Sequence, residues 1–139
     1  MNQEKIKKLA GLALEARNMA YTPYSHYRVG AALLTEGEKV YQGCNIENAS
    51  YGATCCAERT AFFKAVSAGE RVFEAIAIAG GMEGQEPADY AWPCGICRQV
   101  MQEFCGPDFQ IMVVKSLSDY EIYPLAQLLP FGFGGETIR

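Results

Sequence analysis

The sequence has little histidine, no extended run of positive charge and no long apolar stretch. Its 139 residues include one histidine, His26, and the 12 Lys and Arg are outnumbered by 16 Asp and Glu, which gives a net charge of −4. The small basic cluster at residues 5–8 follows a helical pattern, so we interpret it as a solvated helix face. An acidic chain without a basic stripe disfavours DNA or RNA as a partner.

The other absences concern membranes and secretion. No apolar run approaches the length of a membrane span, and residues 1–8 are polar and charged, so no signal-peptide core is present. We therefore expect a cytoplasmic protein with no membrane partner, in a compartment that keeps thiols reduced. Six cysteines in such a chain favour a metal site over a disulfide scaffold. At this length we expect a single domain over residues 1–139.

The order of the predicted elements indicates a layered α/β domain. Apolar spacing predicts helices from residue 6 to about residue 20, over 56–68, over 94–104 and, briefly, over 124–129. Strands are predicted over 27–35, 40–45, 72–79, 109–115 and 121–123, and the first two should form an antiparallel hairpin. Residues 80–93 are predicted to form an exposed loop, and 130–139, with Gly132, Gly134 and Gly135, a flexible tail. The expected fold is a single-domain, three-layer α/β/α sandwich around a mixed sheet of about five strands.

Two short motifs carry the chemistry, Cys56-Ala57-Glu58-Arg59 and Pro93-Cys94-Gly95-Ile96-Cys97. The thiols of Cys56, Cys94 and Cys97 can hold one zinc ion and leave its fourth position to water, as catalytic zinc sites do. Glu58, two residues after Cys56, is predicted to be the general acid–base that moves the protons. A Cys-x-Glu paired with Pro-Cys-x-x-Cys is the pattern of a zinc-dependent nucleoside or nucleobase deaminase.

The surroundings of the thiols are predicted as well. Three thiolates give zinc a net negative set of ligands, and Arg59 lies one helical turn from Cys56. We predict that its guanidinium donates to thiolate sulfur and withdraws charge from the metal. The amino termini of the two predicted helices also favour thiolates.

Other interpretations of the cysteines stay open. A Cys-x-x-Cys alone also fits a redox pair or a structural zinc site, and Cys55 could replace Cys56 as a ligand. We otherwise interpret Cys44, Cys55 and Cys105 as buried small apolar residues. His26 has no thiol near it in sequence, so it is interpreted as a structural or surface residue.

With these motifs in hand, the chain resembles the small, homotetrameric cytidine deaminases whose zinc is held by three cysteines. The resemblance covers nearly the full length, in the blocks 23–25, 29–33, 43–48, 56–61, 93–99 and 128–130. It implies hydrolytic deamination of cytidine and 2′-deoxycytidine to uridine and 2′-deoxyuridine in pyrimidine salvage. It further implies one Zn²⁺ per chain and a homotetramer.

The resemblance also implies substrate contacts. Asn45 and Glu47 would bind the ribose hydroxyls, Tyr27 would pack on the base where the family usually has Phe, and Ala57 would line the base site. Neighbouring subunits would contribute Ala49, Tyr51 and Phe133. Residues 79–93 form a longer segment than is usual in the family, with Trp92 where a small residue normally precedes Pro-Cys. This segment could be a longer surface loop, or it could reshape the pocket entrance.

Two other functions remain candidates. One is a deaminase of another small aminated pyrimidine, such as blasticidin S, against which Asn45 and Glu47 favour a ribose-bearing substrate. The other is a non-catalytic zinc-binding module, in which Glu58 would have no use. A deaminase of RNA or single-stranded DNA would more often use a histidine ligand and a basic groove, and the sequence offers neither.

Overall fold

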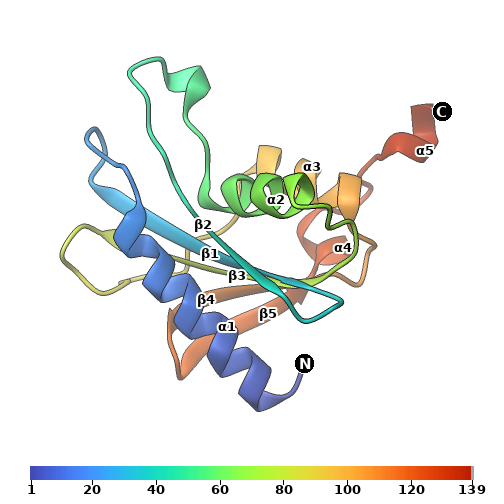
Figure 1. The fold of residues 1–139 in the computed structure, drawn as a ribbon, viewed down its shortest axis with the longest axis horizontal. Coiled ribbons are helices and arrows are strands. Elements are labelled where there is room, and N and C mark those ends of the chain that lie inside the picture. The colour runs from blue at the N-terminus through green and yellow to red at the C-terminus, as the bar shows by residue number, and fades with distance from the viewer. Residues whose placement is uncertain (139) are drawn as a thin grey trace.

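The computed structural model describes residues 1–138 and is built on one five-stranded sheet (Figure 1). The helices are α1 (Gln3–Ala16), α2 (Ala57–Ser67), α3 (Gly95–Phe104), α4 (Leu125–Leu128) and α5 (Gly135–Ile138). The strands are β1 (Tyr27–Thr35), β2 (Val40–Cys44), β3 (Phe73–Met82), β4 (Gln110–Ser116) and β5 (Asp119–Pro124). Two 3₁₀ turns span Arg17–Met19 and Tyr51–Ala53. Within residues 1–138, no helix has the length and apolar character needed to cross a membrane.

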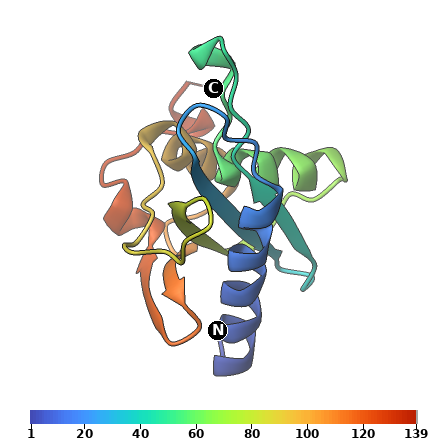
Figure 2. The same cartoon turned by 90° about the vertical axis from the view of Figure 1, so that its left-hand side faces the viewer.

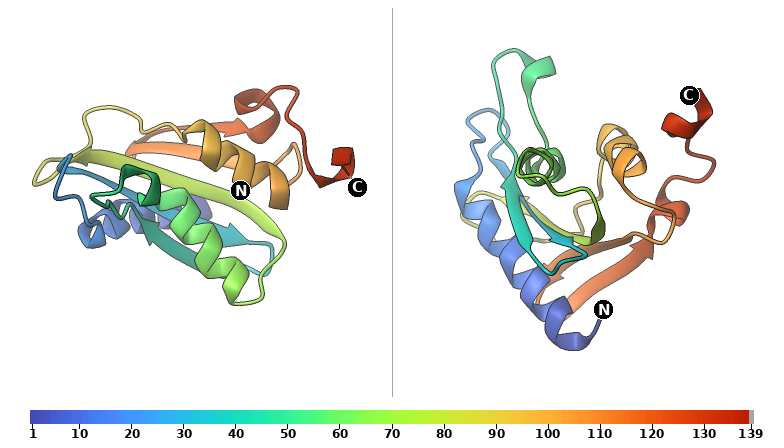
Figure 3. Two further views of the ribbon diagram at one scale, coloured as in Figure 1. Left: turned by 90° about the horizontal axis from the view of Figure 1, so that it is seen from above. Right: turned by 45° about the vertical axis from the view of Figure 1, so that its right-hand side comes forward.

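The sheet is mixed, with the strand order β2-β1-β3-β4-β5. β3 and β4 run parallel because α3 connects them as a crossover, whereas the other neighbouring pairs are antiparallel. α1 covers one face of the sheet, and α2 and α3 cover the other (Figure 3). The predicted three-layer α/β/α fold with a mixed five-stranded sheet is therefore confirmed.

Strand alternation divides the core into two layers. Leu33, Ile76 and Ile78 face α2 and α3, while Leu34, Ala75 and Ala77 face α1. Successive strand residues point to opposite faces, so this register is fixed by burial on both sides. Each large apolar side chain buried in this way stabilises the fold by roughly 1.5–3 kcal/mol. The packing fixes where α2 and α3 begin, and both predicted metal-binding motifs lie at those two points.

The structure corrects the predicted end of β3. The strand continues to Met82, three residues beyond the predicted end at Ala79. Gly80 and Gly81, which suggested a loop, are buried strand residues instead. A side chain on Gly80 would collide with Tyr27 and Ala91, so this glycine is required by close packing rather than by a turn.

The rest of the predicted loop, residues 83–93, is mostly exposed, as expected, but its two prolines are not. Pro87 and Pro93 are buried, and Arg17, which follows α1, reaches across to Gln85, two residues before Pro87. The Arg17 guanidinium donates to the carbonyl oxygens of Arg28 at 3.1 Å and Gln85 at 2.9 Å. Charge-assisted bonds of this kind are stronger than neutral ones, so they anchor the start of residues 83–93 to the sheet.

The carboxy-terminal residues differ from a plain tail. The structure places the short helix α5 at Gly135–Ile138, and Gly134 is buried. The side-chain amide of Gln99 on α3 donates to the carbonyl of Phe133 at 2.9 Å. This bond joins the tail to the helix that carries Cys97.

Gly43 on β2 sets how closely α2 approaches the sheet. A Cβ at this position would overlap the backbone of Ala57 and Ala61. We expect Gly43→Ala to displace the start of α2 and to lower the free energy of unfolding by about 1–3 kcal/mol, as overpacking does. Urea unfolding measures this change. Gly106→Ala is the matched control, because a Cβ there meets nothing within 4 Å; equal losses in the two variants would contradict the prediction.

Candidate active site

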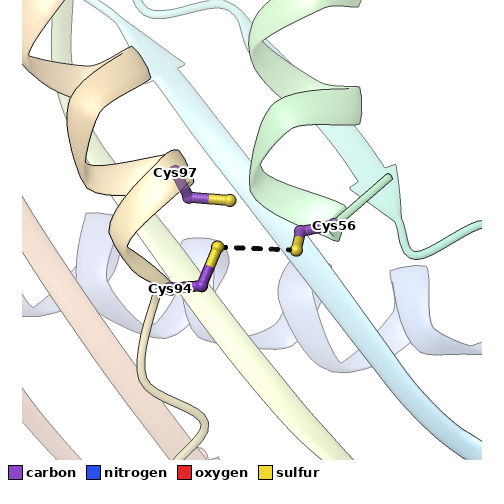
Figure 4. Close-up of side chains that lie close together, drawn as sticks. All are labelled: Cys56, Cys94 and Cys97. Carbon is purple, nitrogen blue, oxygen red and sulfur yellow. Dashed lines mark hydrogen bonds between the residues drawn. The ribbon is translucent and has the colours of Figure 1, made fainter. Parts of the chain in front are cut away.

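Three thiols converge between the amino termini of α2 and α3 (Figure 4). Cys56 and Cys94 are the residues that precede the first turn of each helix, both in extended conformation, and neither side chain caps its own helix. Cys97 lies one turn into α3, on the same face as Cys94. The three Sγ atoms lie within 4.8 Å of one another, and those of Cys56 and Cys94 are 3.8 Å apart.

This geometry fits a zinc ion. Tetrahedral coordination with Zn–S bonds of about 2.3 Å places two sulfur ligands about 3.8 Å apart. The separation of Cys56 and Cys94 matches that value. Three thiolates form a soft ligand set of the kind that zinc prefers. Because only three protein ligands are present in the cluster among residues 1–138, one coordination position would remain for water, as in catalytic rather than structural zinc sites.

The local charges favour a thiolate at Cys56. Hydrogen bonds from the Cys97 thiol, and then from Arg59 and Cys94, lower the pKa of Cys56 to about 5. The Nη2 atom of Arg59 donates to the Cys56 sulfur at 3.5 Å, which places the guanidinium where the sequence predicted it. The hydrogen bond to the Cys56 thiolate, followed by burial and the charge on Glu58, raises the pKa of Cys97. Metal binding requires thiolates, so this arrangement prepares the site for a cation.

Arg59 offers a test of how charge is balanced at this site. We expect Arg59→Gln to weaken zinc binding or to slow the reaction by roughly 10–100-fold, the range for residues that orient metal ligands. Zinc affinity measured against a competing chelator, together with kcat/KM, checks this. Arg59→Lys keeps the charge but loses the planar fork, so it should recover only part of the effect. Unchanged zinc content and kinetics in Arg59→Gln would refute the role.

Glu58 lies in the first turn of α2 and is 4% exposed. Burial, followed by the charge on Cys56, raises the pKa of its carboxyl to about 7. A buried carboxyl next to thiolates is unfavourable for folding unless it has a partner, and active sites are where such groups concentrate.

A cleft of about 310 Å³ opens in front of Glu58, Cys56 and Cys94, whereas the buried Cys97 does not line it. Among the predicted site residues, its lining includes Tyr27, Asn45, Cys56, Ala57, Glu58 and Cys94. It also includes residues that the sequence analysis did not assign: Val29, Thr54, Ile78, Tyr90 and Ala91. Trp92 lines the cleft too, so the long segment before Pro93 does shape the pocket. The signal in the sequence was the pair of aromatic residues just before Pro-Cys.

Asn45 and Glu47 line two neighbouring hollows and do not share a single one. The amide of Asn45 accepts from the Val29 N–H and donates to the Tyr27 carbonyl, both at 2.9 Å, so it is fixed against the end of β1. The carboxylate of Glu47 accepts from the Tyr24 and Ser25 N–H groups at 3.0 and 3.1 Å. Glu47 lines a second hollow of about 360 Å³, which shares Thr54 with the cleft.

The three residues that the resemblance assigned to neighbouring subunits do not line the cleft of their own chain, although Tyr51 lines the adjoining hollow together with Glu47. Ala49 is exposed, and the side chains of Tyr51 and Phe133 are 78% and 57% exposed. The remaining cysteines, Cys44, Cys55 and Cys105, are partly rather than fully buried.

Cys55 lines the cleft but does not belong to the cluster of Cys56, Cys94 and Cys97. His26 is a surface residue, as expected: its ring is exposed and lies 3.3 Å from the Glu83 carboxylate.

Fold and site together define a class of protein: an α/β sandwich with a zinc-type thiol cluster and a buried carboxylate at the junction of two helix amino termini. Comparison with known proteins is consistent with this class. A family model described as the cytidine and deoxycytidylate deaminase zinc-binding region matches residues 3–113. The cytidine deaminase of Sporosarcina psychrophila is 47% identical over 133 residues, which cover 96% of this chain and 94% of that protein.

Other relatives agree. The cytidine deaminase of Halalkalibacterium halodurans is 47% identical over 127 residues, covering 91% of this chain and 92% of the relative. The crystal structure of cytidine deaminase from Burkholderia pseudomallei superposes with a TM-score of 0.81 at 43% identity, covering 96% of this chain and all of that one. The chain therefore belongs to the cytidine and deoxycytidylate deaminase family, as its motifs predicted.

Proposed function

We propose that this protein catalyses the zinc-dependent hydrolysis of cytidine and 2′-deoxycytidine to uridine and 2′-deoxyuridine, with release of ammonia. The observation that carries the proposal is the buried carboxyl of Glu58 next to three convergent thiols, of which Cys56 and Cys94 line the same cleft as Glu58. Zinc, with one ion per chain held by Cys56, Cys94 and Cys97, would supply a coordination position at which water becomes acidic.

Glu58 is the group that moves protons. Its position in the cleft next to Cys56 allows the carboxylate to accept a proton from the attacking water and to deliver it to the ring nitrogen of cytosine. Attack at C4 makes that carbon tetrahedral. The carboxylate then takes the remaining proton from the new C4 hydroxyl and delivers it to the amine, which leaves as ammonia while the C4 carbonyl forms. Because Glu58 is buried on α2, it is held in place and screened from bulk water throughout these transfers.

The neighbouring residues bind the nucleoside. Tyr27 offers a ring face to the base, and Ala57, without a bulky side chain, leaves space next to Glu58. Asn45 and Glu47 bind the ribose hydroxyls; in support, Asn45 lines the cleft and Glu47 lines the adjoining hollow. The Glu47 carboxylate accepts from the Tyr24 N–H and from the N–H and hydroxyl of Ser25, so it still has a lone pair for a sugar hydroxyl.

We further propose that residues 1–139 form one deaminase domain, that four copies assemble, and that the enzyme acts in the cytoplasm in pyrimidine salvage. The loop with Tyr51 and the tail with Phe133 project from the body of the chain, which supports assembly (Figure 1). Large exposed aromatic side chains on such projections are typical of contact surfaces. Ala49, on the same loop as Tyr51, would join this contact.

The direct test is the absorbance change when zinc-loaded protein is added to cytidine, with ammonia measured in parallel. We expect the cytosine band to decline and ammonia to appear in equal amount, on both cytidine and 2′-deoxycytidine. Turnover of blasticidin S without turnover of cytidine would assign the protein to the other deaminase class. A folded, zinc-containing protein that releases ammonia from neither would be a binding module.

A further inference from the structure

The segment between β3 and Pro93 forms one wall of the cleft and is tied to a distant part of the sheet. Tyr90, Ala91 and Trp92 all line the cleft that contains Glu58. The same segment lies against the β4–β5 hairpin (Figure 2). Its Trp92 ring and Tyr90 hydroxyl contact Tyr123 and Asp119 of β5. The wall is therefore bordered by the cleft on one side and by the hairpin on the other.

Alternate side chains of β5 face this wall. Tyr120 and Ile122 pack in the layer under α1, so Asp119, Glu121 and Tyr123 point to the opposite face, where the cleft lies. On that face the Tyr90 hydroxyl donates to the Asp119 carboxylate at 2.5 Å, and the rings of Trp92 and Tyr123 lie 5.5 Å apart.

Lys115 contacts both residues of the Tyr90–Asp119 hydrogen bond, which attaches the wall to β5. Its ammonium lies 3.7 Å from the Asp119 carboxylate and 5.6 Å from the centre of the Tyr90 ring, within range of a cation–π contact. The bond to Asp119 is also the main reason that the pKa of Tyr90 is raised to about 12, so the phenol stays protonated and remains a donor. Hydroxyl-to-carboxylate bonds of this length are among the stronger hydrogen bonds in proteins.

We propose that Tyr90 and Trp92 form a substrate-contacting wall of the cleft, and that the hydrogen bond from Tyr90 to Asp119 holds this wall where a bound nucleoside meets it. This inference rests on the proposed function, because it assumes that a nucleoside occupies the cleft. Rigid aromatic side chains offer a large contact area and lose little conformational entropy on binding. Tyr90 and Trp92 act on affinity, whereas Glu58 and the thiols act on the chemical step.

Two variants test the attachment. Tyr90→Phe keeps the ring and removes the hydroxyl, and Asp119→Ala removes the carboxylate that accepts its hydrogen bond. Each should raise KM for cytidine roughly three- to tenfold, the value of one hydrogen bond, while kcat stays within about twofold and zinc content does not change. Because the two residues act as one unit, the double variant should be no worse than the more impaired single variant.

Trp92 allows binding to be measured without turnover. It is the only tryptophan in the chain, so its fluorescence should change when uridine, the expected product, fills the cleft. Tyr90→Phe should weaken uridine binding by the same factor as it raises KM. Tyr120→Phe is the matched control, because the Tyr120 hydroxyl lies on the other face of the sheet, 3.4 Å from Gln3; both constants should stay at the wild-type values.

The outcomes are separable. If the wild-type protein does not deaminate cytidine, the proposed function fails first. If it does, a Tyr90→Phe variant with unchanged KM and unchanged uridine affinity contradicts the proposed role of the wall. Three other results would also contradict the proposal. They are uridine binding that leaves Trp92 fluorescence unchanged, additive effects in the double variant, and a loss of affinity that follows zinc content.

Discussion

Glu58→Gln is expected to retain zinc and to lower kcat on cytidine by roughly two to four orders of magnitude, the contribution expected of a positioned general acid–base. The amide has nearly the same shape as the carboxyl, so the packing of α2 against the sheet should survive the change. It cannot accept the proton of the attacking water or return one to the amine, and so both transfers lose their carrier. Rates and zinc content measured on the same preparation test the prediction.

The structure provides a control for this variant. Glu103→Gln changes an exposed glutamate on α3, outside the cleft lining, and should leave kcat at the wild-type value. KM distinguishes the proposed role from a structural one. If Glu58 only supported the cleft, its replacement would raise KM and lower the stability rather than kcat. A Glu58→Gln enzyme within tenfold of wild-type kcat would mean that another group moves the protons.

The elements that carry the chemistry were predictable because their signals are local. β1 was predicted with the bounds that it has, Tyr27–Thr35, since its run of Val, Ala and Leu is buried on both faces as a central strand must be. The starts of α2 and α3 were predicted within one residue, because Cys56 and Cys94 stand where extended backbone turns into helix. Local pattern was therefore sufficient to place each thiol at or near a helix start, and the packing of α2 and α3 on one face of the sheet brings the three together.

The features that the sequence did not predict are those that contacts between distant parts of the chain determine. Gly80 and Gly81 have turn-forming composition, yet they continue β3 because they pair with Val29 and Arg28 of β1. They are glycines because Tyr27 and Arg17 occupy the space that a side chain would need. The wall made by Tyr90 and Trp92 depends on Asp119 and Tyr123, which follow about thirty residues later in the chain. No periodicity within either segment indicates that partnership. Similarly, the separation of Asn45 from Glu47 into two hollows follows from hydrogen bonds to β1 and to Ser25, which sequence spacing does not encode.

The thiol cluster joins two helices that otherwise share little surface, so zinc should stabilise the fold as well as serve the reaction. α2 and α3 both rest on the sheet, and Cys97, which is 1% exposed, is the innermost of the three sulfur ligands. A metal that binds only the folded chain adds about 4 kcal/mol to its stability when present at a thousand times its dissociation constant. Removing zinc from the wild-type protein with a chelator should therefore abolish deamination and lower the melting temperature, and added zinc should restore both.

Cys97→Ala separates the metal from simple packing at the same site. Loss of a buried sulfur leaves a small cavity, which lowers stability whether or not zinc is present. The part that depends on zinc is different: the melting temperature of Cys97→Ala should no longer respond to added zinc, and the variant should be inactive. Cys55→Ala should retain one zinc per chain, because Cys55 lies outside the cluster. If the melting temperature of Cys97→Ala still rises with zinc, Cys97 is not a ligand. If Cys55→Ala loses zinc, the first ligand is Cys55 rather than Cys56. The ligand set is thus decided by which cysteine makes folding sensitive to zinc, independently of whether any nucleoside is turned over.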